Sequence, residues 1–162
     1  YCKPGFESRH NRLYWEDDSY LGLGLSAHSY LPGQEWGTRF WNTRNIDEYT
    51  SFVKKHCQSP WENSTERLPG EQKELLAPYE SLTDFCHTAF RKMRGLSEQK
   101  LANKFGDKAL RLTAGPLKQM LAEGLVERDS EGTWRLTNEG VFLSNSVFRS
   151  LTFLAEEWDS LT

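Results

Sequence analysis

The sequence lacks a long uninterrupted run of apolar residues. No run approaches the roughly 20 residues that a membrane-spanning helix needs, and no apolar signal segment opens the chain. These absences argue against a membrane-spanning or secreted protein. We therefore expect a cytoplasmic protein without a transmembrane segment.

Cysteine is scarce and is not clustered. The three cysteines, Cys2, Cys57 and Cys86, are widely spaced, which fits reduced thiols better than a disulfide framework. No two of them have the close spacing of a structural metal site. We expect no metal centre built from these cysteines.

A surplus of positive charge is also missing. Lysine and arginine together number 20 against 23 for aspartate and glutamate, which gives a formal net charge of -3. Proteins that bind nucleic acid through its phosphates present a basic surface. Nucleic acid is therefore not expected as a partner.

Aromatic residues, by contrast, are abundant. The 162 residues include 6 Trp, 6 Tyr and 9 Phe, and 37% of the residues are hydrophobic. This composition is too apolar for a disordered chain, and the length suits one ordinary domain or two small ones. We expect a globular protein with aromatic side chains in its core.

The first part of the chain predicts two strands and a helix. Residues 20–30 form an apolar run that we interpret as a strand, and a second strand is expected to pair with it around residues 40–41. Apolar residues then recur at helical spacing after the cap residue Asn45, which predicts a short helix over residues 46–56.

A linker is expected after this helix. Pro60, Pro69 and Gly70 fall within a stretch that has no regular apolar pattern. We therefore predict a first domain over residues 1–58, a linker over residues 59–77 and a second domain over residues 78–162.

The second domain has a mainly helical pattern with one hairpin. Helices are predicted from residue 78 to about residue 93, from the cap residue Ser97 to Gly106, and over residues 113–123. A hairpin over residues 125–136 and a last helix capped by Thr137 complete the order. This order is typical of a winged-helix module.

The predicted recognition helix and wing carry few cations. Lys118 is the only cation in residues 113–123, and the wing carries the acidic residues Glu127, Asp129 and Glu131. Such a surface suits a phosphate backbone poorly. One hypothesis is therefore a non-enzymatic winged-helix interaction domain that does not bind DNA.

A histidine, an amide and two large aromatics lie within six residues near the start of the chain, at His10, Asn11, Tyr14 and Trp15. This composition suits the binding of a planar ligand. On the residues alone, the alternative is that His10 and Asn11 cap a turn and the two aromatics belong to the core.

These four residues match an HNxxYW motif, and residues 20–30 follow it as a glycine-containing apolar run. Together they closely resemble the later part of the oxygen-independent coproporphyrinogen III oxidase family, in which HNxxYW marks the haem-chaperone-like HemW branch. Residues 121–126, 134–140 and 143–148 are similar to the carboxy-terminal domain of that family. The chain therefore resembles a carboxy-terminal fragment.

The resemblance implies an α+β fold. A few strands from the end of a partial (β/α) barrel sheet would be followed by a mainly helical, winged-helix-like domain. The family is a radical S-adenosylmethionine family, and a CxxxCxxC motif in it holds a 4Fe-4S cluster. This sequence has no such motif, so the cluster and S-adenosylmethionine are expected only in a longer parent protein. The fragment alone is not expected to be an enzyme.

The resemblance also implies a binding site for haem or a porphyrinogen. His10 is a candidate haem ligand, Tyr14 and Trp15 would offer flat apolar surface, and Asn11 would orient a polar edge. Gly22 and Gly24 would let a flat ligand or another backbone approach closely, although two glycines are weak evidence for a ligand and sheet packing alone also explains them. The expected binding residues, none of them catalytic, are His10, Asn11, Tyr14, Trp15, Gly22, Gly24 and His28.

Three functions follow as hypotheses. The first is a haem chaperone, whose parent protein binds haem and transfers it to an acceptor protein. The second is a true coproporphyrinogen III oxidase of porphyrin biosynthesis, and the third is the winged-helix interaction domain. The HNxxYW motif favours the first.

Overall fold

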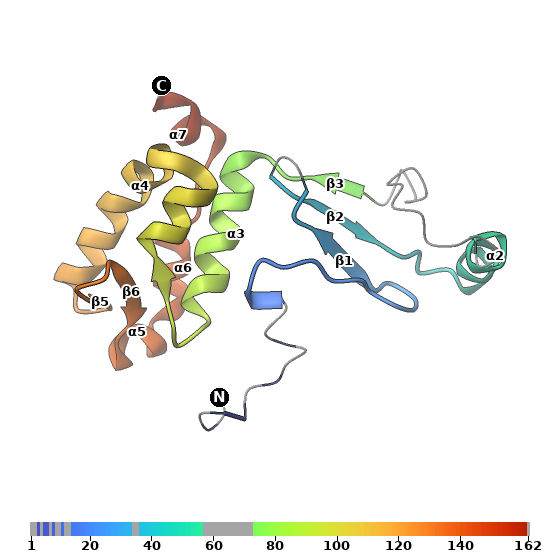
Figure 1. The fold of residues 1–162 in the computed structure, drawn as a ribbon, viewed down its shortest axis with the longest axis horizontal. Coiled ribbons are helices and arrows are strands. Elements are labelled where there is room, and N and C mark those ends of the chain that lie inside the picture. Colours follow the sequence, from blue (N-terminus) through green and yellow to red (C-terminus); the bar gives the residue numbers. More distant parts are fainter. Residues whose placement is uncertain are drawn as a thin grey trace. The chain divides into compact units, whose positions relative to one another are not determined.

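The computed structural model describes residues 14–33, 36–56 and 73–161, together with residues 3, 5, 6, 8 and 11. The protein is an α+β chain with small antiparallel sheets, as predicted (Figure 1). It divides into two compact units, Asp18–Leu76 and a second made of Tyr1–Asp17 and Ala77–Thr162. We call them the sheet unit and the helical unit.

The division differs from the three-part arrangement expected from the sequence. Tyr1–Asp17 is grouped with the helical unit and not with the strands that follow it. Most of the expected linker, residues 59–77, lies outside the described residues. The assignment of functions to the predicted domains stays a prediction.

The sheet unit is built on a three-stranded antiparallel sheet in the order β1-β2-β3. Ser29 lies opposite Phe40 in the register of the first two strands, and the predicted pairing between these regions is confirmed. Side chains of Tyr30, Phe40 and Leu76 are buried. The elements are β1 (His28–Leu31), β2 (Thr38–Trp41), α2 (Ile46–His56) and β3 (Lys73–Leu75).

The strand predicted over residues 20–30 was too long. Tyr20 forms only an isolated bridge to Tyr30, and the chain folds back between them. Gly24 and Ser26 have positive φ angles of 101° and 56°, which a regular strand does not allow. The origin of these strands in a barrel sheet stays a prediction.

Helix α2 begins where its sequence predicts. The Oδ1 atom of Asn45 accepts hydrogen bonds from the backbone N–H groups of Asp47 (2.9 Å) and Glu48 (3.2 Å). These bonds satisfy two of the amides that the first turn of a helix leaves without a partner. The expected cap is therefore confirmed.

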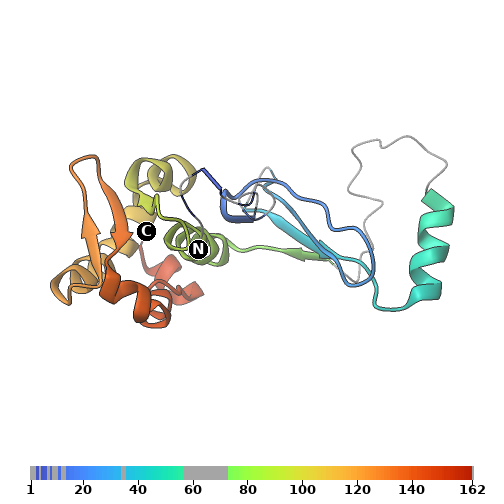
Figure 2. The same ribbon diagram turned by 90° about the horizontal axis from the view of Figure 1, so that it is seen from below.

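The helical unit packs its helices around a second three-stranded sheet, in the order β4-β6-β5. Figure 2 shows β5 and β6 as a hairpin at one end of this unit. The order of helices and hairpin is as predicted, and the winged-helix assignment stays a prediction. The elements are α3 (Pro78–Phe90), β4 (Leu96–Ser97), α4 (Glu98–Ala122), β5 (Val126–Arg128), β6 (Thr133–Leu136), α5 (Asn138–Phe142), α6 (Ser144–Ser150) and α7 (Ala155–Ser160).

The break predicted at Gly106 is confirmed, because its φ of 73° interrupts the helical path inside α4. The helix resumes at once, so the predicted start at residue 113 was wrong. Thr113 does not cap a helix. It is buried, and its hydroxyl donates to the carbonyl oxygen of Ala109 at 2.9 Å.

The single last helix predicted after Thr137 is divided into α5 and α6, and α7 follows as a further short helix. Thr137 does cap the first of them, since its Oγ1 accepts from the N–H of Gly140 at 3.0 Å. The division at Leu143 turns Phe142 outward, and its side chain is 85% exposed.

The core of the helical unit lies between α3, α4, β4, β6 and the last helices. Several core side chains have no exposed surface, and Trp134 of the hairpin strand β6 is also buried. The completely buried side chains include Leu82, Cys86, Leu96, Leu101, Val147 and Leu151. No helix in the described part of the chain is long and apolar enough to cross a membrane.

Candidate functional site

The motif segment, which we define as residues 10–17, is described in part. His10 lies outside the described residues, so its expected role as a haem ligand stays a prediction. Asn11, Tyr14 and Trp15 have helical backbone. Tyr14 and Trp15 are half-buried, and Asn11 is exposed with its N–H donating to Oγ of Ser8 at 3.3 Å.

Trp15 is stacked against a cation from the helical unit. The guanidinium carbon of Arg91, the residue that caps the C-terminus of α3, lies 5.2 Å from the ring centroid of Trp15. The same guanidinium lies 5.3 Å from the ring centroid of Phe148 in α6. Both distances are within the range of cation–π attraction. Two aromatic rings that are far apart in the sequence thus share one arginine.

Charged residues hold the end of the motif segment on the same unit. Asp17 forms an ion pair with Lys104 of α4. Burial lowers the pKa of Lys92, nearby Lys100 lowers it further, and the negative charges of Glu16 and Asp17 act in the opposite direction. The residues of the motif segment therefore meet cations from the region of α3 and α4.

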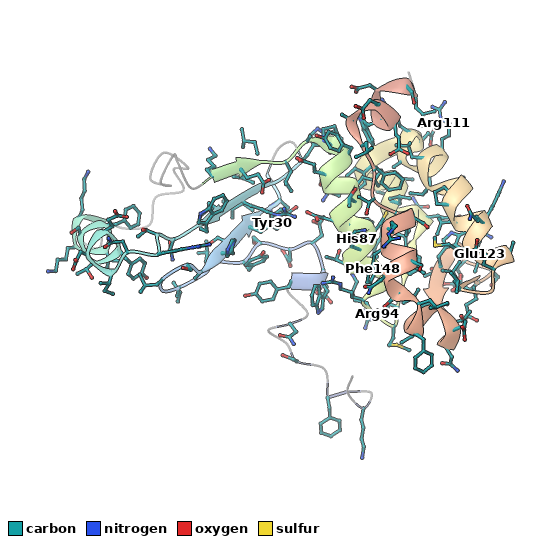
Figure 3. The ribbon with its side chains drawn as sticks, turned by 180° about the vertical axis from the view of Figure 1, so that it is seen from behind. Tyr30, His87, Arg94, Arg111, Glu123 and Phe148 are labelled. Atoms are coloured by element: carbon teal, nitrogen blue, oxygen red, sulfur yellow. The ribbon has the colours of Figure 1, made fainter. Side chains whose placement is uncertain are left out.

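His87 lies beside this cluster and is engaged in packing. Its ring centroid is 5.2 Å from that of Phe148, and its Nε2 donates to the carbonyl oxygen of Phe148 at 2.8 Å. Burial lowers the pKa of His87, and the charge of Arg91 adds to the effect. Figure 3 shows His87 and Phe148 together on the helical unit. This arrangement favours a neutral ring whose Nε2 is already occupied.

The three remaining described candidates lie in the sheet unit. A Cβ atom at Gly22 would lie 2.3 Å from the carbonyl oxygen of His28, so the chain's own backbone makes the close approach there. Gly24 has open space around its Cα and takes a positive φ. Backbone geometry therefore explains both glycines.

Three polar side chains hold the loop around these glycines. The Oγ of Ser29 accepts from the N–H of Gly22 at 2.9 Å, and the hydroxyl of Tyr49 accepts from the N–H of Gly24 at 3.0 Å. The side-chain amide of Asn42 donates to both glycine carbonyls. No local pattern in the sequence indicates these contacts, because the partners lie 7 to 25 residues apart along the chain.

His28 is exposed at the start of β1, opposite Trp41 in the strand register. The two ring centroids are 5.7 Å apart. An imidazole beside an indole on an exposed face is a second arrangement suited to a flat ligand. The second strand has only four residues, so the alternation of polar and apolar residues along it is too short to mark Trp41 as a candidate binding residue.

The structure therefore divides the predicted site residues. Asn11, Tyr14 and Trp15 belong to the helical unit, whereas Gly22, Gly24 and His28 belong to the sheet unit. The expectation that they form one wall of a site stays a prediction. Arg91 and Phe148 are additions that sequence reasoning missed.

An iron–sulfur cluster does not fit the residues of this chain. The sequence has no CxxxCxxC motif, and the described cysteine, Cys86, is completely buried, which raises the pKa of its thiol. Thiolate ligands require deprotonation. No group of three or more metal-ligating side chains occurs among the residues that the structure describes.

Comparison with curated proteins shows what this chain is similar to. The proteins matched by this chain are heme chaperones. They carry the name heme chaperone HemW in Bacillus subtilis (31% identity over 156 residues), Synechocystis (27% over 172 residues) and Lactococcus lactis (28% over 145 residues). The resemblance indicated by the motifs is thus confirmed.

These matches cover 96%, 97% and 90% of the chain. The chain in turn spans 37%, 39% and 34% of the length of the three relatives. No protein-family model matches the chain, and no solved structure matches it significantly.

Proposed function

We propose that this chain is the part of a HemW-type haem chaperone that contributes the HNxxYW segment to haem binding, and that the whole protein passes haem to an acceptor protein. The observation that carries the proposal is the similarity of nearly the whole chain to curated heme chaperones. The alternatives of a true oxidase or a plain interaction domain have no comparable support.

The geometry of the motif segment supports this proposal. Tyr14 and Trp15 are half-buried and neighbouring, so they are both fixed in place and accessible. His10 is four residues before Tyr14 in the sequence, and a neutral imidazole is a common axial ligand of haem iron. We propose His10 as that ligand and the two aromatics as the surface beneath the porphyrin.

The sheet unit contributes the second group of proposed binding residues. His28 presents an exposed ring beside Trp41, while Gly22 and Gly24 shape the loop that precedes it. The proposed role of His28 is to bind the tetrapyrrole from this unit. Haem is the cargo of such a protein. The 4Fe-4S cluster and S-adenosylmethionine of the radical family would be held by other parts of the parent.

Haem titration of the full-length protein tests the binding step. We expect a Soret band with a defined endpoint in the wild type, and at least about a tenfold loss of affinity in His10→Ala. His28→Ala removes the other proposed imidazole, and we expect a smaller loss of affinity there because His10 is the proposed axial ligand. Unchanged spectra and affinity in His10→Ala would exclude His10 as the ligand.

Transfer is tested separately from binding. Haem-loaded protein is mixed with apomyoglobin as a probe acceptor, and the growth of the holomyoglobin spectrum is followed. Transfer faster than the dissociation of haem into a neutral scavenger supports a chaperone. Equal rates would show that the protein only stores haem.

A further inference from the structure

Among the residues that the structure describes, Arg91 contacts two aromatic rings and has no acidic partner. Its guanidinium carbon lies 5.2 Å from the ring centroid of Trp15 and 5.3 Å from that of Phe148. No carboxylate in the described part of the chain forms an ion pair with it, whereas Lys104, Arg128 and Arg135 each have one. The side chain is exposed.

This arrangement leaves the hydrogen-bonding edges of the guanidinium available. Cation–π stacking uses the flat faces of the group. The N–H donors lie in the plane of the group and point outward from its edge, in the fork geometry that fits a carboxylate. Two stacked rings also hold the side chain in one orientation, so little conformational freedom is lost when an anion binds.

The surroundings favour an anion. Lys92 directly follows Arg91 and Arg94 lies three residues after it, and Lys100 is close enough to lower the pKa of Lys92. Of the two nearby acidic groups, Asp17 is already paired with Lys104, and Glu16 is a single negative charge against the cations of this region. Figure 3 shows where Arg94 follows α3. A local excess of positive charge raises the concentration of anionic ligands at a surface.

The position of Arg91 relates it to the motif. Trp15 is the last residue of HNxxYW and lies against the guanidinium, so a flat ligand held by this segment has its edge near Arg91. We propose that Arg91 binds a carboxylate at the edge of a flat tetrapyrrole, which for haem is a propionate. This inference rests on the proposed haem-binding function and names the group that the site recognises.

The test compares two ligands that differ only in their carboxylates. Iron protoporphyrin IX and its dimethyl ester are titrated in the same detergent into full-length wild type, Arg91→Ala and Arg91→Gln. Because hydrogen bonds to charged groups are the strong ones, we expect each substitution to weaken binding of the free acid about tenfold or more. Binding of the ester should change less than about twofold.

Arg111→Ala is the matched control. Arg111 is an exposed arginine of α4 and is labelled in Figure 3, and its replacement should change neither affinity. Arg91→Gln keeps most of the side-chain stem, so it reports on the charge even if Arg91→Ala disturbs folding, which circular dichroism would reveal.

The outcomes separate this inference from the function on which it rests. An equal loss for both ligands would mean that Arg91 only holds Trp15 in place, and would overturn the inference. So would unchanged binding of the free acid. A wild type that binds neither ligand would overturn the proposed haem binding itself, and the inference with it.

Discussion

The two units of this chain differ most in how much apolar surface they bury. The helical unit has a continuous core with completely buried residues on α3, α4 and α6, such as Leu82, Leu101 and Val147. Among the residues of the sheet unit that the structure describes, the buried large apolar side chains are Tyr30, Phe40 and Leu76. Its Leu23 is 85% exposed.

The two units hold their proposed binding residues in place by different interactions. The helical unit holds the motif residues by packing and charge, against a core that resists change. The sheet unit holds Gly22 and Gly24 mainly by hydrogen bonds to side chains such as Asn42, each of which contributes little net stability. The first group of site residues is therefore expected to be rigid and the second adaptable.

Truncating one leucine in each unit should give the largest contrast. Leu82→Ala removes a fully buried side chain and should lower the free energy of unfolding by about 3 kcal/mol. Leu23→Ala, at an exposed position, should change it by less than about 0.5 kcal/mol. Urea unfolding followed by circular dichroism measures both. Equal effects would show that the described burial does not reflect the stability of the two units.

Adding a methyl group at Gly22 should sharpen the comparison within the sheet unit. A Cβ there would meet the backbone of Ala27 and His28, and relief of such a clash costs about 1–3 kcal/mol. Gly33→Ala is the control, because its Cβ would enter open space. Hydrogen exchange of the β1 and β2 amides reports the change. Loss of protection in both variants would argue against a specific close approach at Gly22.

The hairpin of the helical unit should respond less strongly. Glu98 accepts from Arg128 at 2.7 Å and 2.9 Å and from Nε1 of Trp134 at 2.8 Å. Glu98→Gln keeps the shape but weakens these bonds, so we expect a loss of about 1 kcal/mol. Glu127→Gln, on the exposed side of β5, is the matched control. The midpoints of thermal unfolding of the two variants should differ by a few degrees. Identical curves would show that the hydrogen bonds of Glu98 to Arg128 and Trp134 do not stabilise the hairpin.

The smallest expected effect is the pH dependence caused by His87. Its pKa is lowered in the folded state by burial first and by Arg91 next, against the bond to Phe148. The folded state therefore favours the neutral ring. Its stabilising contribution is present above the ordinary histidine pKa and is lost as the pH falls through the lower folded-state value. His87→Gln should flatten the stability profile over this window, and an unchanged slope would assign the effect to other groups.

Local chemistry explains what the sequence could predict. The caps Asn45, Ser97 and Thr137 act within three residues of their own positions. Gly124 takes the positive φ expected of a residue that ends a helix, and the N–H of Leu125 then donates to the carbonyl of Met120. Such contacts can be predicted from the sequence because the two partners are only a few residues apart along the chain.

The errors arose where distant residues decide the structure. The turn at Ser26 depends on a hydrogen bond from its N–H to the carbonyl of Thr43, and the division of the last helix depends on how the final segments pack. Arg91 carries no motif of its own. Its importance follows from contacts with Trp15 and Phe148, which no periodicity reveals. The haem motif itself was identified through resemblance to a family.

The ion pair between Asp17 and Lys104 joins residues 87 positions apart. During synthesis the motif segment emerges before Arg91 and Lys104, which hold it, and the whole sheet unit is made in between. Closing so long a loop is slow compared with forming local structure. The nascent chain is thus expected to pass through a period in which its HNxxYW segment exists without its partners, so that the proposed binding site matures after the helical unit has folded.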